Sequence, residues 1–235
     1  MWAVVLSVLL PLFAAPHSAI FPEARFSSVE IYASGDVRVV GSDTARPGVL
    51  GTSEKCLLTS KVVGTSLQVY YPTSTHGTVC DGVLTITVPR SVSLRSRGYS
   101  SDLRVKSVDG GIEVNQNLGS VSIEKAAGPI SIRMAQGQVR ASGLSGDLDL
   151  WLGRGAAQFG FQSVSPNSRV SFMTGDASVD LKVPSGSAIA IVRRQKFGTL
   201  ISELPISATP QMKISMRSET GNIRILATAP SPGVF

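Results

Sequence analysis

The chain has 235 residues, of which 43% are hydrophobic, 16% charged and 6% aromatic, and its formal net charge at pH 7 is +6. Its many Val, Ile and Leu residues exclude a disordered chain, and the lack of Ala/Glu/Lys/Leu/Arg runs at helical spacing excludes a helix-rich one. The positive charge favours anionic partners such as phosphorylated or carboxylated polymers, although a basic chain without such a partner fits equally well.

The first 19 residues have the pattern of a targeting segment. An apolar run extends from Trp2 to Ala15 and is followed by Pro16-His17-Ser18-Ala19, in which His17 stands where a small residue is preferred. Its length suits the hydrophobic region of a signal peptide and falls short of the roughly 20 residues that a membrane-spanning helix needs. We expect residues 1–19 to be a signal peptide cleaved after Ala19, which leaves no stable membrane span; a retained anchor is the alternative. The mature protein would then be secreted, periplasmic or part of the cell envelope.

The two cysteines agree with export. Cys56 and Cys80 are the only thiols in the chain, and an even number in an oxidising compartment indicates a disulfide. The bridge would close a loop of about 25 residues and contribute ~3.5 kcal/mol in the chain-entropy model; two separately buried thiols are the alternative. Two cysteines and His76 make a poor ligand set for zinc. We expect no metal and no cofactor.

Short segments of alternating apolar and polar residues begin soon after the leader. They predict strands rather than amphipathic helices, and Pro89 closes the last of them. The predicted strands are 26–32, 37–40, 67–71 and 83–88. We expect residues 20–95 to form an irregular N-terminal β cap that contains the disulfide.

From about Leu103 the pattern becomes a repeat of about nine residues. Each unit consists of a turn glycine, a polar residue and an apolar–polar–apolar triplet, and interruptions appear after Phe161. Because side chains alternate between the faces of a strand, Val121 and Ile123 should point into the core and Ser122 away from it. The regularly spaced glycines are at positions 111, 119, 128, 137, 146 and 155.

Units of this size cannot form a core alone, so they must stack on one another. A parallel β-solenoid stacks equivalent positions directly, whereas an antiparallel meander or sandwich also tolerates about nine residues per strand and turn. Self-similarity favours the solenoid. The expected fold is therefore all-β, with a β-solenoid (parallel β-helix-like) of short strands punctuated by glycine over residues 96–228 and a flexible tail over 229–235.

Several motifs resemble the bacterial putative-adhesin family, a domain of unknown function built from β-strand repeats. The matching motifs are Leu144–Leu150 (LSGDLDL), Thr174-Gly-Asp, Thr220-Gly-Asn, the strand Gly35-Asp36-Val-Arg-Val and the strand end Val88-Pro89. The resemblance covers about residues 25–228 and implies a solenoid-like fold on an exported or envelope-associated protein. It supplies no catalytic residues, and the cysteine pair departs from the family pattern.

Candidates for catalysis are few. Asp147 and Asp149 would share one face of a strand with Cα atoms about 7 Å apart, which is compatible with glycosidic acid–base chemistry. They also occupy the outward polar positions of one repeat unit, and this is the interpretation that we favour. No nucleophile elbow accompanies His76. We therefore expect no enzymatic activity.

Two features could contact a ligand. Arg193, Arg194 and Lys196 form the densest basic cluster, which could bind phosphate or uronate groups or could simply keep a loop soluble. Trp151 could stack on a sugar ring or pack at a strand end. The linear sequence shows no basic–aromatic interleaving that would predict nucleic-acid binding.

These observations predict an exported, non-catalytic, adhesin-like interaction scaffold at the cell surface or in the periplasm. Its expected partner is an anionic polysaccharide or another cell-surface component, bound through many weak contacts along a rigid surface. The alternatives are a carbohydrate-active β-helix enzyme that acts on polysaccharide and a purely structural envelope protein.

Overall fold

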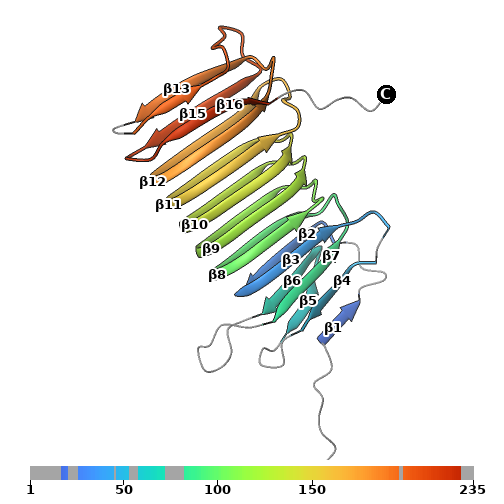
Figure 1. Ribbon diagram of the computed structural model, residues 1–235. Helices are drawn as coiled ribbons and strands as arrows, with labels where there is room; N and C mark the ends of the chain where they lie inside the picture. The colour runs from blue at the N-terminus through green and yellow to red at the C-terminus, as the bar shows by residue number, and fades with distance from the viewer. Residues whose placement is uncertain are drawn as a thin grey trace, which may run out of the picture.

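The computed structural model describes residues 17–20, 26–44, 46–52, 58–71, 82–195 and 198–228 (Figure 1). These residues form sixteen strands in one hydrogen-bonded sheet, and no helix occurs among them. The expected all-β class is therefore confirmed for the described residues. Within the same ranges we find no helix that could cross a membrane.

The strands differ in length, and the longest lie in the region of the repeat. They are β1 (His17–Ile20), β2 (Ser28–Ala33), β3 (Gly35–Gly41), β4 (Gly48–Gly51), β5 (Thr59–Val63), β6 (Ser66–Tyr71), β7 (Val83–Val88), β8 (Ser93–Lys106), β9 (Ile112–Ala126), β10 (Ile130–Leu144), β11 (Leu148–Phe161), β12 (Ser168–Pro184), β13 (Ile189–Gln195), β14 (Leu200–Ser202), β15 (Met212–Ser218) and β16 (Ile223–Thr228).

The long strands β8 to β12 lie side by side in the middle of the sheet (Figure 1). Neighbours pair in parallel: Ile112 on β9 lies opposite Ile130 on β10, which lies opposite Leu148 on β11. Partners from β8 to β10 are 18 residues apart, as in the side-chain hydrogen bond between Arg95 and Glu113. The parallel pairing excludes an antiparallel meander as the arrangement of these strands.

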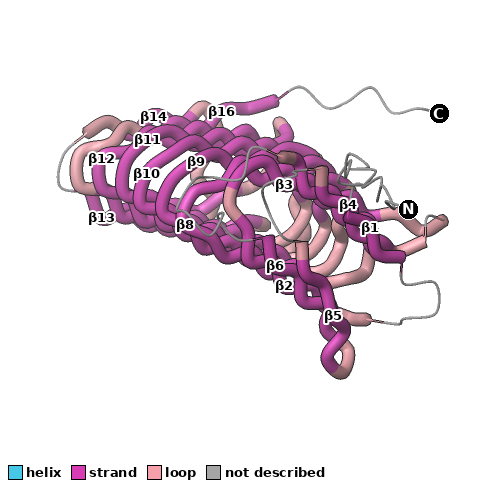
Figure 2. The backbone as a smooth tube through the Cα atoms, turned by 90° about the horizontal axis from the view of Figure 1, so that it is seen from below, coloured by secondary structure: helices cyan, strands magenta, loops and turns pink. Residues whose placement is uncertain are grey.

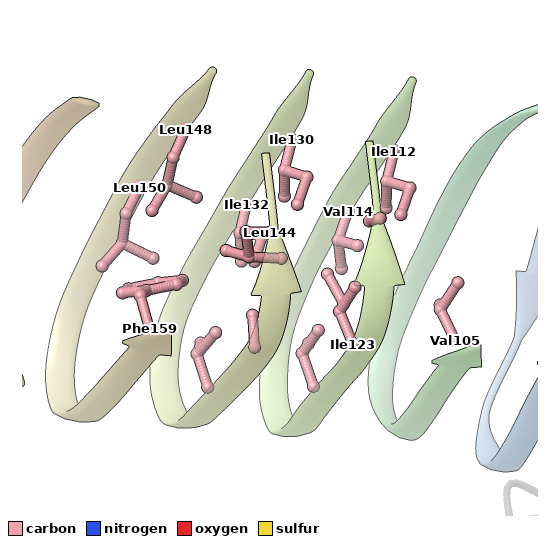
Figure 3. Close-up of a cluster of buried hydrophobic side chains, with 14 of the residues drawn as sticks. Val105, Ile112, Val114, Ile123, Ile130, Ile132, Leu144, Leu148, Leu150 and Phe159 are labelled. Carbon is pink, nitrogen blue, oxygen red and sulfur yellow. The ribbon is translucent and has the colours of Figure 1, made fainter. Parts of the chain in front are cut away.

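Each long strand bends near its middle, so that one turn of the chain has two arms. Figure 3 shows Ile112 and Val114 on one arm of β9 and Ile123 on the other, with their side chains directed into the space between the arms. All three are buried, and Ser122 is only partly covered, as the alternation predicts. We call the part of the strand before the bend the first arm and the part after it the second arm. Figure 2 shows successive turns following one another as coils.

The nine-residue repeat corresponds to one arm, so two consecutive units make one turn of the chain. Successive units lie on alternate arms. Units that lie next to each other in space are therefore separated by two repeat lengths in the sequence, as with Ser120 and Asp102, which are 18 residues apart. The glycines consequently form two columns instead of one. Gly119, Gly137 and Gly155 lie at the bends, and Gly110, Gly128 and Gly146 lie where one strand leads into the next. Gly110, and not Gly111 as the sequence spacing predicted, therefore takes the equivalent position in the second column.

Both columns require glycine because adjacent backbones touch there. A Cβ atom on Gly155 would lie 1.9 Å from the carbonyl oxygen of Gly137, and Gly155 has a φ of +133°. A Cβ atom on Gly128 would lie 2.4 Å from the carbonyl oxygen of Gly110. Only a residue without a side chain allows this approach, and at the bend it also permits the positive φ.

The core between the arms is filled by side chains that pack between neighbouring turns and also from one arm to the other. Phe159 on β11 and Phe172 on β12 are both buried, with ring centroids 5.7 Å apart and an interplanar angle of 22°. Burial of one such side chain stabilises the fold by ~1.5–3 kcal/mol. Near the bend, buried Gln116 accepts a hydrogen bond from Ser101 Oγ at 2.7 Å and donates one to the Ser101 carbonyl oxygen at 3.2 Å. These two bonds satisfy polar groups that the bend buries.

At the N-terminal end, the order of the turns in space differs from their order in the chain. β2 and β3 together form one turn, which pairs in parallel with the two arms of β8. β6 and β7 form the next turn outward. Antiparallel strands end the stack: β5 pairs with β6, β4 with β7, and β1 with β4. β1 contains Ala19, after which we expect cleavage; Cys56 and Cys80 lie outside the described residues.

The C-terminal end shows a second reversal of order. β15 and β16 pair with the first and second arms of β12, and β13 and β14 lie outside them. The chain therefore passes over one position, forms the last turn, and returns to fill the gap. Contacts between β12 and β16 consequently join residues 44 apart in the sequence, as with Asp180 and Arg224. The irregular repeats after Phe161 reflect this altered path, and residues 229–235 lie outside the described residues.

A candidate ligand-binding face

The outer surface of the first arms carries a groove of about 860 Å³ that runs across β2, β8, β9, β10, β11 and β12. It lies on this surface because the outward residues of consecutive turns include small ones, such as Gly111, Ser131 and Ser171, between longer ones. Since the strands are in register, outward side chains of equal register form rows across them. Two such rows matter for the site.

The first row, which we call the acidic row, runs along the groove. In cross-strand order it consists of Gln68, Glu30, Arg95, Glu113, Ser131, Asp149 and Ser171. Arg95 donates from Nε to Glu113 at 2.8 Å, and its guanidinium lies 3.7 Å from the Glu30 carboxylate. Gln68 also donates to Glu30 at 3.3 Å. The acids at this end of the row are therefore paired within the protein, and Asp149 makes no ion pair with a described residue.

The aspartates that the sequence suggested as a catalytic pair both line the groove, on the same outer face. The backbone N–H of Arg169 donates to Asp147 Oδ1 at 2.9 Å, so this carboxylate joins the start of β11 to the start of β12. Such a contact gives Asp147 a structural use. Among the described residues, no cluster of three or more His, Cys, Asp or Glu side chains has the geometry to hold a metal ion.

The second row, which we call the arginine–tryptophan row, lies two residues further along each strand. In cross-strand order it consists of Tyr70, Tyr32, Arg97, Asn115, Arg133, Trp151, Met173 and Arg217. Trp151 is 42% exposed and Met173 is 45% exposed. Tyr32 and Tyr70 stack with ring centroids 4.9 Å apart. The row contains no acidic residue.

Three arginines of this row have no partner among the described side chains. Arg97, Arg133 and Arg217 are exposed and make no hydrogen bond or ion pair there. Arg133 lies directly opposite Trp151 in the register of β10 and β11. Unpaired guanidinium groups beside an exposed indole are available for a ligand, because no internal contact must first be broken.

The second arms carry a different distribution of charge. Asp36 forms ion pairs with Arg38 and Arg104, each at 3.2 Å. Arg224 donates from Nε to Asp180 at 2.7 Å, and this hydrogen bond and the charge of Asp180 raise the pKa of Arg224. A depression of about 300 Å³ lies beside this second pair. Most cations of the second arms are thus already neutralised within the protein.

The structure brings together some of the ligand contacts that the sequence suggested. Trp151 belongs to the arginine–tryptophan row, and the backbone of Arg194 on β13 is in register with that of Arg217 on β15. Arg193 lies one position earlier, in register with buried Met216. Lys196 lies outside the described residues. The role of the basic cluster in binding therefore stays a prediction.

Sequence reasoning missed Arg97 and Arg133. The signal for them was present at twice the repeat period, because Arg97, Asn115, Arg133 and Trp151 follow one another at intervals of 18 residues. A nine-residue alignment places these residues beside the outward positions of the other arm and conceals the row.

No protein-family model and no curated protein matches the sequence. Among solved structures, a putative adhesin from Bacteroides fragilis NCTC 9343 is 14% identical, with a TM-score of 0.54 over 91% of this chain and 98% of that one. A putative cell adhesion protein from Clostridium sporogenes is 11% identical, with a TM-score of 0.43 over 91% of this chain and all (100%) of that one. A putative adhesin from Parabacteroides distasonis is 9% identical, with a TM-score of 0.41 over 90% and 97%. The similarity to the Bacteroides fragilis structure shows that the two chains share a fold.

Proposed function

We propose that this protein is an exported, non-catalytic, adhesin-like scaffold, built as a β-solenoid, that binds an extended ligand across its first arms. The parallel turns in register around one core support the solenoid. The description of the Bacteroides fragilis neighbour as a putative adhesin supports a binding role. The observation that carries the proposal is the groove itself, which crosses consecutive turns and places outward side chains at regular intervals.

The mechanism follows from the rigidity of the stack. Outward residues are fixed by inward neighbours that are fully buried, such as Ile132 beside Arg133 and Leu150 beside Trp151. A ligand that lies across the strands therefore meets preformed contacts and loses little affinity to ordering of the protein. Several modest contacts on one chain-like ligand then act together, because each bound segment raises the local concentration of the next.

The experiment measures retention and cleavage in the same assay. The purified mature protein is applied to immobilised polysaccharides and to intact bacterial cells, and the soluble fraction is analysed for released oligosaccharides. We expect retention without product. Release of oligosaccharides that is abolished by joint Asp147→Asn and Asp149→Asn substitution would establish the enzyme instead. If the protein is not retained and releases no oligosaccharide, the result would favour a purely structural protein.

A matched pair of variants locates the binding surface. Ser131→Tyr fills the groove on the first arm of β10, and Ser122→Tyr places the same side chain on the second arm of β9. Both serines face outward, so both variants should keep the stability of the wild type within about 0.5 kcal/mol. We expect Ser131→Tyr alone to lose retention. Equal loss in both variants, or in neither, would contradict binding in the groove.

A further inference from the structure

We propose that the ligand of the first arms is a carboxylated polysaccharide that lies across the strands along the arginine–tryptophan row. This inference rests on the proposed function and names its ligand class. It starts from the row itself, which no short motif in the sequence reveals. The charge of this row, its aromatic surface and the composition of the neighbouring acidic row each limit the chemical class of the ligand.

The charge of the row selects an anion. Arg97, Arg133 and Arg217 present guanidinium groups that no described side chain neutralises, and no acid lies in the row between them. A guanidinium binds a carboxylate through two parallel hydrogen bonds. Arg97 and Arg133 are two strands apart, so their Cα atoms are separated by roughly 10 Å. An anionic ligand must therefore carry charges at intervals and must extend across the strands.

The aromatic members of the row select a ligand with flat apolar faces between its charges. Trp151 lies next to Arg133, and its exposed indole offers a surface on which the C–H face of a sugar ring can pack. Met173, on the other side of Trp151, extends this apolar surface. A chain of uronic acid residues combines such rings with a carboxylate on each.

The neighbouring acidic row favours a polysaccharide over a single-stranded nucleic acid. Asp149 lies two residues before Trp151 on β11, and Glu113 lies two residues before Asn115 on β9, which is roughly 7 Å along the strand in each case. Their carboxylates accept hydrogen bonds from the many hydroxyl groups of a polysaccharide, which the phosphodiester backbone of a single-stranded DNA does not offer. Nucleic-acid channels also stack successive bases on successive aromatics, and Trp151 has no aromatic neighbour in the row.

The test uses polygalacturonate, its fully methyl-esterified form and a single-stranded oligonucleotide as immobilised probes, with the mature wild-type protein. The esterified polymer keeps the sugar rings and removes the charge. We expect retention of the protein on polygalacturonate that weakens as salt is raised, and at least tenfold weaker binding to the ester. Equal binding to both polymers would overturn the carboxylate assignment while leaving the scaffold function intact.

Variants then assign the binding to the row. Arg133→Gln and Trp151→Ser should each weaken binding to polygalacturonate by about five- to tenfold, the loss of one charged or aromatic contact. Arg140→Gln is the matched control, because Arg140 is an exposed arginine on the second arm of the same strand without an ion pair to a described residue. Equal weakening by Arg140→Gln, tighter binding to the oligonucleotide, or no retention on polygalacturonate would each overturn the proposal.

Discussion

Arg224 on β16 and Asp180 on β12 form a two-point ion pair between residues 44 apart in the sequence. Arg224 lies in the position that the chain first passes over and later fills, directly next to β12. The ion pair therefore joins the last strand to the regular part of the stack. Without it, β16 would be held to β12 mainly by a short run of backbone pairing.

We expect Arg224→Gln to loosen β16 without unfolding the stack. Loss of the pair removes one side-chain contact between β12 and β16, so amide hydrogen exchange should quicken in Ile223–Thr228 and stay unchanged in β9 and β10. Arg154→Gln is the control, because Arg154 and Asp176 are both highly exposed and lie 4.0 Å apart. Equal exchange in the two variants would show that the backbone register alone holds β16.

Substitution of a bend glycine should destabilise the protein far more than substitution of another glycine in the same strand. Gly155→Ala would bring a Cβ atom against the carbonyl oxygen of Gly137 at a positive φ, with an expected cost of about 1–3 kcal/mol. Gly160→Ala would meet its nearest atom, the Ala141 carbonyl oxygen, at 3.9 Å, and should change stability by less than about 0.5 kcal/mol. Urea unfolding measures both, and similar midpoints would contradict the close backbone contact.

The buried hydrogen bonds at the bend should be necessary for stability. Gln116→Leu keeps the approximate volume but leaves the hydroxyl and carbonyl oxygen of Ser101 without their partner. We expect a loss of about 1–3 kcal/mol in the free energy of unfolding. Asn115→Leu, at the exposed neighbouring position, should cost much less. If Gln116→Leu were as stable as the wild type, these bonds would contribute nothing to the bend.

The disulfide expected between Cys56 and Cys80 is tested by mass. The exported protein should gain 2 Da on reduction, about one hydrogen per thiol, and should lose about 3.5 kcal/mol of stability. Cys56→Ser with Cys80→Ser controls for effects of the reductant, because this variant should show the lower stability in both conditions. Free thiols in the protein as exported would disprove the bridge.

Much of the local structure follows from the repeat. Alternation predicted that Val121 and Ile123 face inward and Ser122 outward, and the burial of these residues agrees. The glycine spacing predicted tight corners, which the structure contains at Gly119 and Gly137. These features were predictable because side-chain direction and backbone clash act within one strand or between equivalent positions of neighbouring units.

The pairing at the two ends was not predictable in the same way. Any apolar alternating strand can pair with any other, so the pattern does not say that β6 lies outside β2 or that β15 lies between β12 and β13. The strand over Thr59–Val63 is mostly exposed, so its residues carry no signal of burial. Which strands are neighbours depends on how the whole chain pairs the backbone N–H and C=O groups of its edge strands.

The sequence by itself determined an all-β chain, low in charge and aromatic residues because its repeat needs aliphatic inner and small polar outer positions. Only the tertiary structure decided that two nine-residue units make one turn, and this doubling created the arginine–tryptophan row. Arg97, Arg133 and Trp151 are far apart along the chain and have unrelated local neighbours. They form one surface only because parallel strands stack in register, which is a relation between segments and not a property of any one of them.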